Sequence, residues 1–191
     1  MRSLLPLFVT LSAAAASAGT PGSVTITQAS DPAVTEGDVI IDGEPAANFA
    51  LVLDYRKWTE IMPDVAKVEI TEQKGMDARV TLISPSGHRD NLHFHNTPQA
   101  NLIYFEDTGN GGRADVWAEI LFTAHDPGAG AGARSAEQPA QTRVHIKLYA
   151  KLHGVASLLV SEHDVREKRE HQIAGELTHI RDYFRRRVAN R

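Results

Sequence analysis

The chain has 191 residues, of which 42% are hydrophobic and 23% charged, and these fractions are ordinary for a globular protein that buries its own core. With 20 Lys and Arg against 24 Asp and Glu, the formal net charge is -4. A net negative chain lacks the positive field that holds a phosphate backbone, so nucleic acid is not expected as a partner. Cysteine is absent, which excludes disulfides, a thiol nucleophile and a lipid anchor on cysteine.

The first 18 residues have the pattern of a secretory signal peptide. Arg2 precedes an apolar run from Leu4 to Ala16, and Ala16-Ser17-Ala18 is the small-x-small pattern that signal peptidase accepts. We expect cleavage after Ala18 and a secreted or periplasmic mature protein. The run is shorter than the about 20 residues of a membrane-spanning helix, so an uncleaved anchor is the weaker alternative. No stable membrane insertion is expected after cleavage, and transient membrane contact is left open.

Residues 19–38 are rich in Gly, Pro, Ser and Thr and are predicted to form a leader, with one edge strand near Val24–Thr27 left open. A single domain is expected over residues 39–188. It begins with a short strand, Val39–Asp42, which a glycine closes. A helix over Pro45–Leu53 follows, because proline in the first turn of a helix loses no hydrogen bond.

Six β-rich segments come next. They cover residues 67–73, 77–84, 91–97, 101–107, 113–125 and 142–152. In the fifth segment, Val116, Ala118 and Ile120 fall on one face, while Asp115 and Glu119 fall on the other. Such alternation is typical of an antiparallel sheet that is covered on one side. The Gly/Ala-rich stretch before the last segment, over residues 126–141, is expected to be a mobile loop.

The C-terminal segment is predicted to be one long helix that begins at Ser161 and runs to about Val188. Its apolar residues follow spacings of four, three, four and four and form one stripe: Ile173, Leu177, Ile180, Phe184 and Val188. Asp164, three residues after Ser161, completes a variant of the capping box. The sequence therefore predicts an α+β fold in which a curved antiparallel sheet of about six to seven strands wraps around a long C-terminal helix.

This order of elements resembles the START-like superfamily, also called SRPBCC or Bet v 1-like, and within it the polyketide cyclase and coenzyme Q-binding branch. The resemblance covers roughly residues 39–184, and its most specific part is the stretch LVLDYRKWTEIMPDV, with Asp54-Tyr55, Trp58 and Pro63. It implies a helix-grip fold with two short helices after the first strand. It also implies that these short helices plug one end of a groove, so that their bulky side chains serve packing.

A curved sheet cannot close tightly on one helix along its whole length, so we expect an apolar groove between them. Strand alternation and the helix stripe assign its ligand-binding residues: Val80, Leu82, Leu92, Phe94, Val116, Ala118, Ile120, Ile146, Leu148, Val165, Arg169 and Ile173. Arg169 stands out because it places a charge on the apolar helix face. Its guanidinium either meets a carboxylate, phosphate or carbonyl of the ligand, or reaches solvent, Glu162 or a strand carboxylate.

His93 and His95 lie two residues apart on one predicted strand and share a face, a spacing that occurs in metal sites. Leu92 and Phe94 are expected to face the groove, which leaves both histidines on the solvated face. The sequence fixes no third ligand, so no metal is predicted. No catalytic motif is found and no cofactor is implied.

Three functions follow from this pattern. The preferred hypothesis is an exported carrier that holds a hydrophobic small molecule, such as a lipid, quinone or polyketide-like compound. The second is a cyclase or dehydratase that uses the same groove to orient a hydrophobic substrate, with Arg169 or a tyrosine polarising a carbonyl. The third is a protein-interaction module in which the groove binds no ligand.

Overall fold

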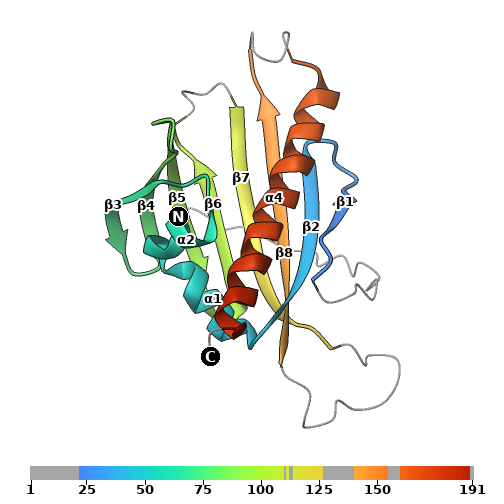
Figure 1. The fold of residues 1–191 in the computed structure, drawn as a ribbon. Coiled ribbons are helices and arrows are strands. Elements are labelled where there is room, and N and C mark those ends of the chain that lie inside the picture. Colours follow the sequence, from blue (N-terminus) through green and yellow to red (C-terminus); the bar gives the residue numbers. More distant parts are fainter. Residues whose placement is uncertain (1–21, 110, 112–113, 127–139, 155–159, 190–191) are drawn as a thin grey trace, which may run out of the picture.

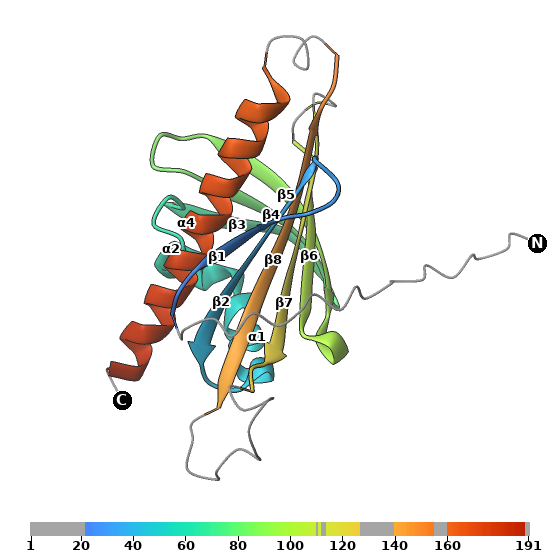
Figure 2. The same ribbon diagram turned by 90° about the vertical axis from the view of Figure 1, so that its right-hand side faces the viewer.

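Residues 22–109, 111, 114–126, 140–154 and 160–189 are described by the computed structural model of the chain. One antiparallel sheet forms the framework, and the long C-terminal helix and the short helices that follow the second strand lie on one of its faces (Figures 1 and 2). The predicted signal peptide and most of the Gly/Ala-rich loop lie outside the described residues. The expectations for those two segments therefore stay predictions.

The strands and helices follow in the order that the sequence patterns predicted. The strands are β1 (Thr25–Gln28), β2 (Val34–Asp42), β3 (Lys67–Lys74), β4 (Asp77–Ile83), β5 (Arg89–Thr97), β6 (Leu102–Asp107), β7 (Ala114–Ala124) and β8 (Gln141–Leu152). The helices are α1 (Pro45–Leu53), η1 (Tyr55–Lys57), α2 (Trp58–Ile61), η2 (Pro98–Ala100) and α4 (Glu162–Ala189). The side-chain oxygen of Ser161 accepts a hydrogen bond from the N–H of Asp164 at 3.1 Å, which confirms the predicted N-cap. Among the described residues, no helix is both long and apolar enough to cross a membrane.

The strands form one sheet in the order β1-β2-β8-β7-β6-β5-β4-β3, and every neighbouring pair is antiparallel. β2 pairs with β8 along its whole length, from Val34 opposite Tyr149 to Asp42 opposite Gln141. This pairing joins the first long strand to the last strand. It therefore brings the two ends of the domain side by side under α4 (Figure 1).

The sheet has eight strands, more than the six to seven that the sequence predicted. One of these strands is β1, which lies where the sequence allowed an edge strand in the leader. β2 begins at Val34 instead of Val39. β2 is longer than expected because β8 provides partners for these additional residues, such as Leu148 opposite Thr35.

The apolar stripe of α4 faces the sheet as far as Phe184. The first four residues of the predicted stripe, from Ile173 to Phe184, are buried. Val188, which was predicted to continue the stripe, is 53% exposed, and Tyr183 is buried instead. The reason is geometric. From Ile180 to Val188 the stripe takes two steps of four residues each. Since about 3.6 residues make one turn, these two steps carry Val188 about 80° around the helix axis relative to Ile180.

The close approach of α4 to β2 depends on Gly37. A Cβ atom at this position would lie 2.6 Å from Cγ2 of Ile173 and 2.8 Å from Cδ1 of Leu177. These distances are shorter than real Cβ contacts, and both helix side chains are fully buried. The helix can therefore lie at this distance because residue 37 has no side chain.

The short helices after β2 pack against one end of the sheet, as the resemblance implied. Tyr55 and Trp58 are buried, and the Trp58 ring meets the ring of Phe94 edge-on with 5.5 Å between centroids. Nε1–H of Trp58 donates to the carbonyl of Val52 at 2.7 Å, and the Tyr55 hydroxyl accepts a hydrogen bond from Asn96 at 2.7 Å. The polar atoms of both rings thus have partners inside the protein, and the segment serves packing.

On the opposite face of the sheet, Asp38 links β2 to β8. Its carboxylate accepts hydrogen bonds from Nε and Nη2 of Arg143 at 2.6 and 2.8 Å and lies 3.0 Å from Nδ1 of His145. Burial by itself raises the pKa of Asp38, but the hydrogen bonds from His145 and Arg143 outweigh burial and lower that pKa to about 2. The ionised carboxylate is therefore favoured in the folded protein.

We expect Gly37→Ala to lower the free energy of unfolding by about 1–3 kcal/mol, because the new methyl group must displace Ile173 or Leu177 in a packed core. Gly175→Ala on α4 is the matched control, since a Cβ there meets no other atom within 4 Å. That control should raise the free energy of unfolding by about 0.5–1 kcal/mol through helix propensity. Urea unfolding followed by circular dichroism checks both. Equal effects of the two changes would contradict the role assigned to Gly37.

Asp38→Asn should lower the free energy of unfolding by about 2 kcal/mol at pH 7. The folded-state pKa lies below the ordinary value of 3.8, so the stabilisation is present above that value and is lost as the pH falls towards 2. The difference between wild type and variant should therefore shrink between pH 4 and pH 2. Urea titrations across this range measure it. Asp90→Asn, which removes an exposed carboxylate paired with His88, should have little effect at any pH.

Candidate functional site

A pocket of about 400 Å³ that is partly open to solvent, called the cavity below, is lined by the end of β8 and the start of α4. Figure 1 shows that these two ends lie close together and away from α1. The walls are residues 31–33 between β1 and β2, residues 149–152 of β8, Val160 before α4, and Glu162, Val165 and Arg169 in its first turns. The volume is within the range of about 300–1,000 Å³ that small-molecule sites occupy. The lining combines apolar side chains with charged ones, so it suits a molecule that has both an apolar body and a polar end.

Arg169 is the most deeply buried charged group of this cavity, at 3% exposure. Nε–H donates to the hydroxyl of Thr35 at 3.2 Å, one Nη donates to the carbonyl of Ala150 at 3.0 Å, and the other donates to the carbonyl of Pro32. These bonds tie α4 to the start of β2 and to the end of β8. The prediction that Arg169 lies on the buried helix face is confirmed, but its acceptors are two carbonyls and a hydroxyl, in place of the carboxylates that the sequence suggested.

The charge of Arg169 is only partly compensated. Burial lowers the pKa of the guanidinium, while the nearby charges of Glu162 and Asp31 act in the opposite direction. Within the described part of the chain, no carboxylate forms an ion pair with Arg169. A guanidinium has five N–H groups, and three are used in the bonds above, so two remain for another acceptor. An anionic or carbonyl oxygen in the cavity would match these donors.

The predicted ligand-binding residues fall into three groups. The first is buried in the core at 2% exposure or less: Val80, Phe94, Ala118, Ile120, Ile146 and Ile173. The second lies at the edge of the core, where Leu92 and Leu148 are 8% and 4% exposed and Leu82 and Val116 are half-buried. The third group, Val165 and Arg169, lines the cavity.

Aromatic rings of the short helices pack on rings of β5 and β6. The ring centroid of Phe94 lies 4.5 Å from that of Tyr55, 5.1 Å from that of Phe105 and 5.5 Å from that of Trp58. Phe94, which was predicted to line the groove, therefore packs against the plug segment.

The sequence analysis missed the wall formed by Asp31, Pro32 and Ala33, because it treated this segment as a leader. The Asp31 side chain accepts a hydrogen bond from the N–H of Ala33 at 2.8 Å, and its carbonyl accepts one from the N–H of Val34 at 3.0 Å. This is a tight turn that delivers the Pro32 carbonyl to Arg169. The dipeptide Asp-Pro is a turn signal and could have indicated it.

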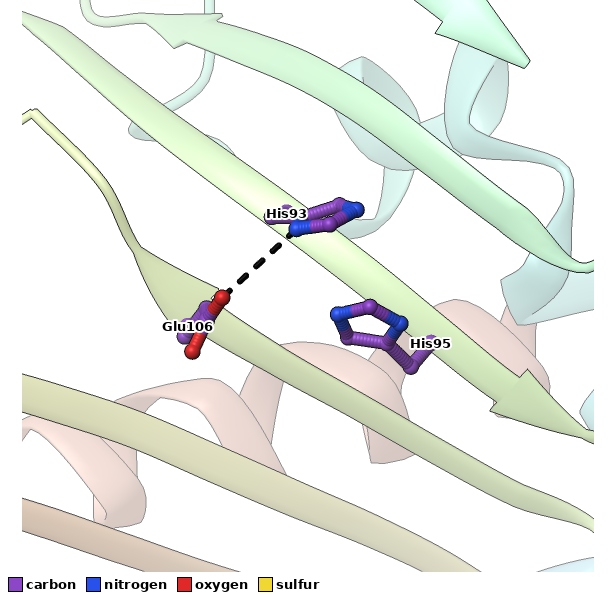
Figure 3. Close-up of side chains that lie close together, drawn as sticks. All are labelled: His93, His95 and Glu106. Atoms are coloured by element: carbon purple, nitrogen blue, oxygen red, sulfur yellow. Dashed lines mark ion pairs between the residues drawn. The ribbon is translucent and has the colours of Figure 1, made fainter. Parts of the chain in front are cut away.

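The outer face of the sheet, opposite to α4, carries the histidines of β5. Leu92 and Phe94 point into the core and are buried, and His93 and His95 lie on the other face, as predicted. Their side chains lie beside Glu106 of β6, and these three residues could hold a metal ion (Figure 3). The group is separate from the cavity, which lies on the α4 side.

Glu176 of α4 is a second titratable group of interest. It is half-buried, and its carboxylate accepts a hydrogen bond from Nε2 of Gln172 at 2.8 Å. Burial raises the pKa of Glu176 to about 7, against the effect of the Gln172 hydrogen bond and with a further contribution from the charge of Asp64. A carboxyl group with such a pKa can both donate and accept a proton near neutral pH.

Replacing Glu176 with Gln should raise the free energy of unfolding at pH 8 by on the order of 1 kcal/mol. The folded-state pKa lies above the ordinary value of 4.5, so the wild type loses stability as the pH rises from 4.5 to about 7, and the glutamine does not. Wild type and variant should differ least at pH 4. Thermal unfolding from pH 4 to 8 checks this. Glu167→Gln, at an exposed position of the same helix, should leave the pH dependence unchanged.

Neither the protein-family models nor the curated protein sequences match this chain. Solved structures do. The Zhui aromatase/cyclase of Streptomyces sp. R1128 is 14% identical and superimposes with a TM-score of 0.57 over 87% of this chain and 96% of its own. A START superfamily protein of Mycobacterium smegmatis is 9% identical, with a TM-score of 0.60 over 80% of this chain and 97% of its own. The two-domain aromatase/cyclase StfQ of the steffimycin pathway is 13% identical, with a TM-score of 0.59 over 82% of this chain and 52% of its own. The chain thus has the START-like, or SRPBCC, fold that polyketide aromatase/cyclases share.

Proposed function

We propose that this chain is an exported carrier for a hydrophobic small molecule with a polar end, such as a lipid, a quinone or a polyketide-like compound. The observation that carries the proposal is the cavity of about 400 Å³ with the buried guanidinium of Arg169 in its wall. Export rests on the signal pattern of residues 1–18.

The polar and apolar parts of the cavity suggest how such a ligand would bind. Its oxygen atom would accept hydrogen bonds from the two N–H groups of Arg169 that have no described acceptor. Its apolar body would lie against Pro32, Leu152 and Val165. Burying about 200 Å² of apolar ligand surface contributes on the order of 5 kcal/mol before the entropic cost of binding. This apolar contribution is nonspecific, and the hydrogen bonds from Arg169 would determine how the ligand is oriented.

A cyclase-type enzyme is the second candidate, because two of the similar structures are described as aromatase/cyclases. In that case Arg169 would polarise a carbonyl of the substrate, and Arg169→Ala should abolish turnover. A carrier would show no turnover for the variant to abolish, which separates the two functions.

The carrier function predicts that the full-length chain, exported by a Gram-negative host, is recovered from the periplasm with Gly19 as its first residue. Organic extraction of this material should release a hydrophobic compound in about equimolar amount, which mass spectrometry identifies. Val165→Phe should reduce the amount of bound compound, because the larger side chain takes up part of the cavity beside Arg169. Arg169→Met should weaken binding of a fatty acid more than binding of its neutral methyl ester.

Val188→Phe is the matched control for Val165→Phe, since it adds the same ring to an exposed position of the same helix. Circular dichroism of each variant verifies that it is folded. An extract without any hydrophobic compound, together with no binding of fatty acid or ester, would contradict the carrier function and favour a protein-interaction module. Retention of the protein in the cytoplasm would contradict export alone.

A further inference from the structure

Three side chains on the outer face of the sheet converge in a way that the cavity does not involve. His93 and His95 of β5 and Glu106 of β6 each offer a ligand atom, and these atoms all lie within 4.8 Å of one another (Figure 3). Nδ1 of His93 lies 3.5 Å from a carboxylate oxygen of Glu106, and the two imidazole centroids are 4.1 Å apart. Among the described residues, these three form the one group of His, Asp or Glu side chains whose donor atoms are close enough together to hold an ion.

Strand register brings the third donor to the two histidines. Residues two apart on a strand point to the same face, which places His93 beside His95. Antiparallel pairing places Glu106 directly opposite His93, and β5 and β6 each have a neighbouring strand on both sides. All three Cα positions are therefore fixed by the sheet, and only side-chain rotations remain free.

The surroundings of the histidines also suit a cation. Nδ1 of His95 lies 3.0 Å from a carboxylate oxygen of Asp77 on β4. A histidine that binds a metal commonly gives its other ring N–H to a carboxylate, which orients the ring. With Nδ1 held by Asp77, Nε2 of His95 is the nitrogen available for an ion.

Charged side chains surround the histidines. Lys74 and Arg79 line the same surface pocket as His93, and Nε of Arg79 forms an ion pair with Glu72 of β3 at 3.2 Å. The two carboxylates that contact the histidines, Glu106 and Asp77, have together the charge that a divalent cation neutralises.

We propose that His93, His95 and Glu106 bind one divalent first-row transition metal ion such as Zn²⁺. Two imidazoles and one carboxylate form a donor set that suits this class of ion, and Mg²⁺ and Ca²⁺ prefer oxygen ligands only. Ligand atoms on a tetrahedral Zn²⁺ are about 3.4 Å apart, so the side chains must close by about 1–1.5 Å. The side chains of His95 and Glu106 are 44% and 45% exposed and have room to make this movement. Water would take the fourth position.

Binding is tested on the full chain, produced without an affinity tag and stripped with a chelator. Titration with Zn²⁺ in a calorimeter should give one site, and thermal unfolding should shift upwards with Zn²⁺ but not with Mg²⁺, because the ion joins β5 to β6 in the folded state alone. Co²⁺ should give the visible absorption of a four-coordinate site. Asp77→Asn should weaken Zn²⁺ binding by about 10–100-fold, the usual effect of losing a hydrogen-bond partner of a ligand.

His95→Ala and Glu106→Gln should each weaken Zn²⁺ binding more than Asp77→Asn does. His88→Ala is the matched control, since it removes an exposed histidine that is paired with one carboxylate, and it should leave the affinity unchanged. Circular dichroism shows whether each variant keeps its fold. Equal Zn²⁺ affinity in wild type, His95→Ala and Glu106→Gln would overturn the proposal, as would the absence of any saturable site below about 100 μM Zn²⁺. Neither result bears on the cavity, which has no residue in common with this group.

Discussion

The contact between α4 and β2 at Gly37 is the interaction on which the arrangement of this domain depends. The helix approaches the sheet to a distance that leaves no room for a Cβ atom at residue 37, and Ile173 and Leu177 become fully buried there. Nearer to its start, the same helix is held by Arg169 through the carbonyls of Pro32 and Ala150. The helix thus packs directly on the sheet at Gly37, and the cavity lies beside Arg169 at its start.

This difference along α4 also determines where a ligand can bind. The rings of Tyr55, Trp58, Phe94 and Phe105 pack on one another over β5 and β6, and none of them lines the cavity. The cavity has a charged part at Arg169 and an apolar part at residues such as Val165. Hydrogen bonds to the backbone carbonyls of Pro32 and Ala150 hold the Arg169 side chain in place. Recognition at such a site depends on the polar end of a ligand as well as on its apolar surface. The same fold can thus accept different molecules through changes at one end.

The two faces of the sheet have separate chemistry because side chains alternate along each strand. Leu92 and Phe94 belong to the core, and His93 and His95, their neighbours in sequence, belong to the outer face. A residue on the outer face can change without altering the packing beneath α4. The histidine and glutamate group can therefore act independently of the cavity, and its occupation by an ion would stiffen β5 and β6 without blocking the ligand site.

The sequence by itself determined what depends on local pattern. Alternation fixed the faces of β7 and β8, the helical period put Arg169 on the buried face of α4, and Ser161 marked its first turn. Contacts between distant segments were decided by the tertiary structure alone. The pairing of β2 with β8 turned the end of the expected leader into a cavity wall, the Trp58 ring packed against Phe94, and strand register placed Glu106 beside His93. The physical reason is that periodicity specifies which way a side chain points, whereas the partner that it meets depends on register and packing distance between segments far apart in the chain.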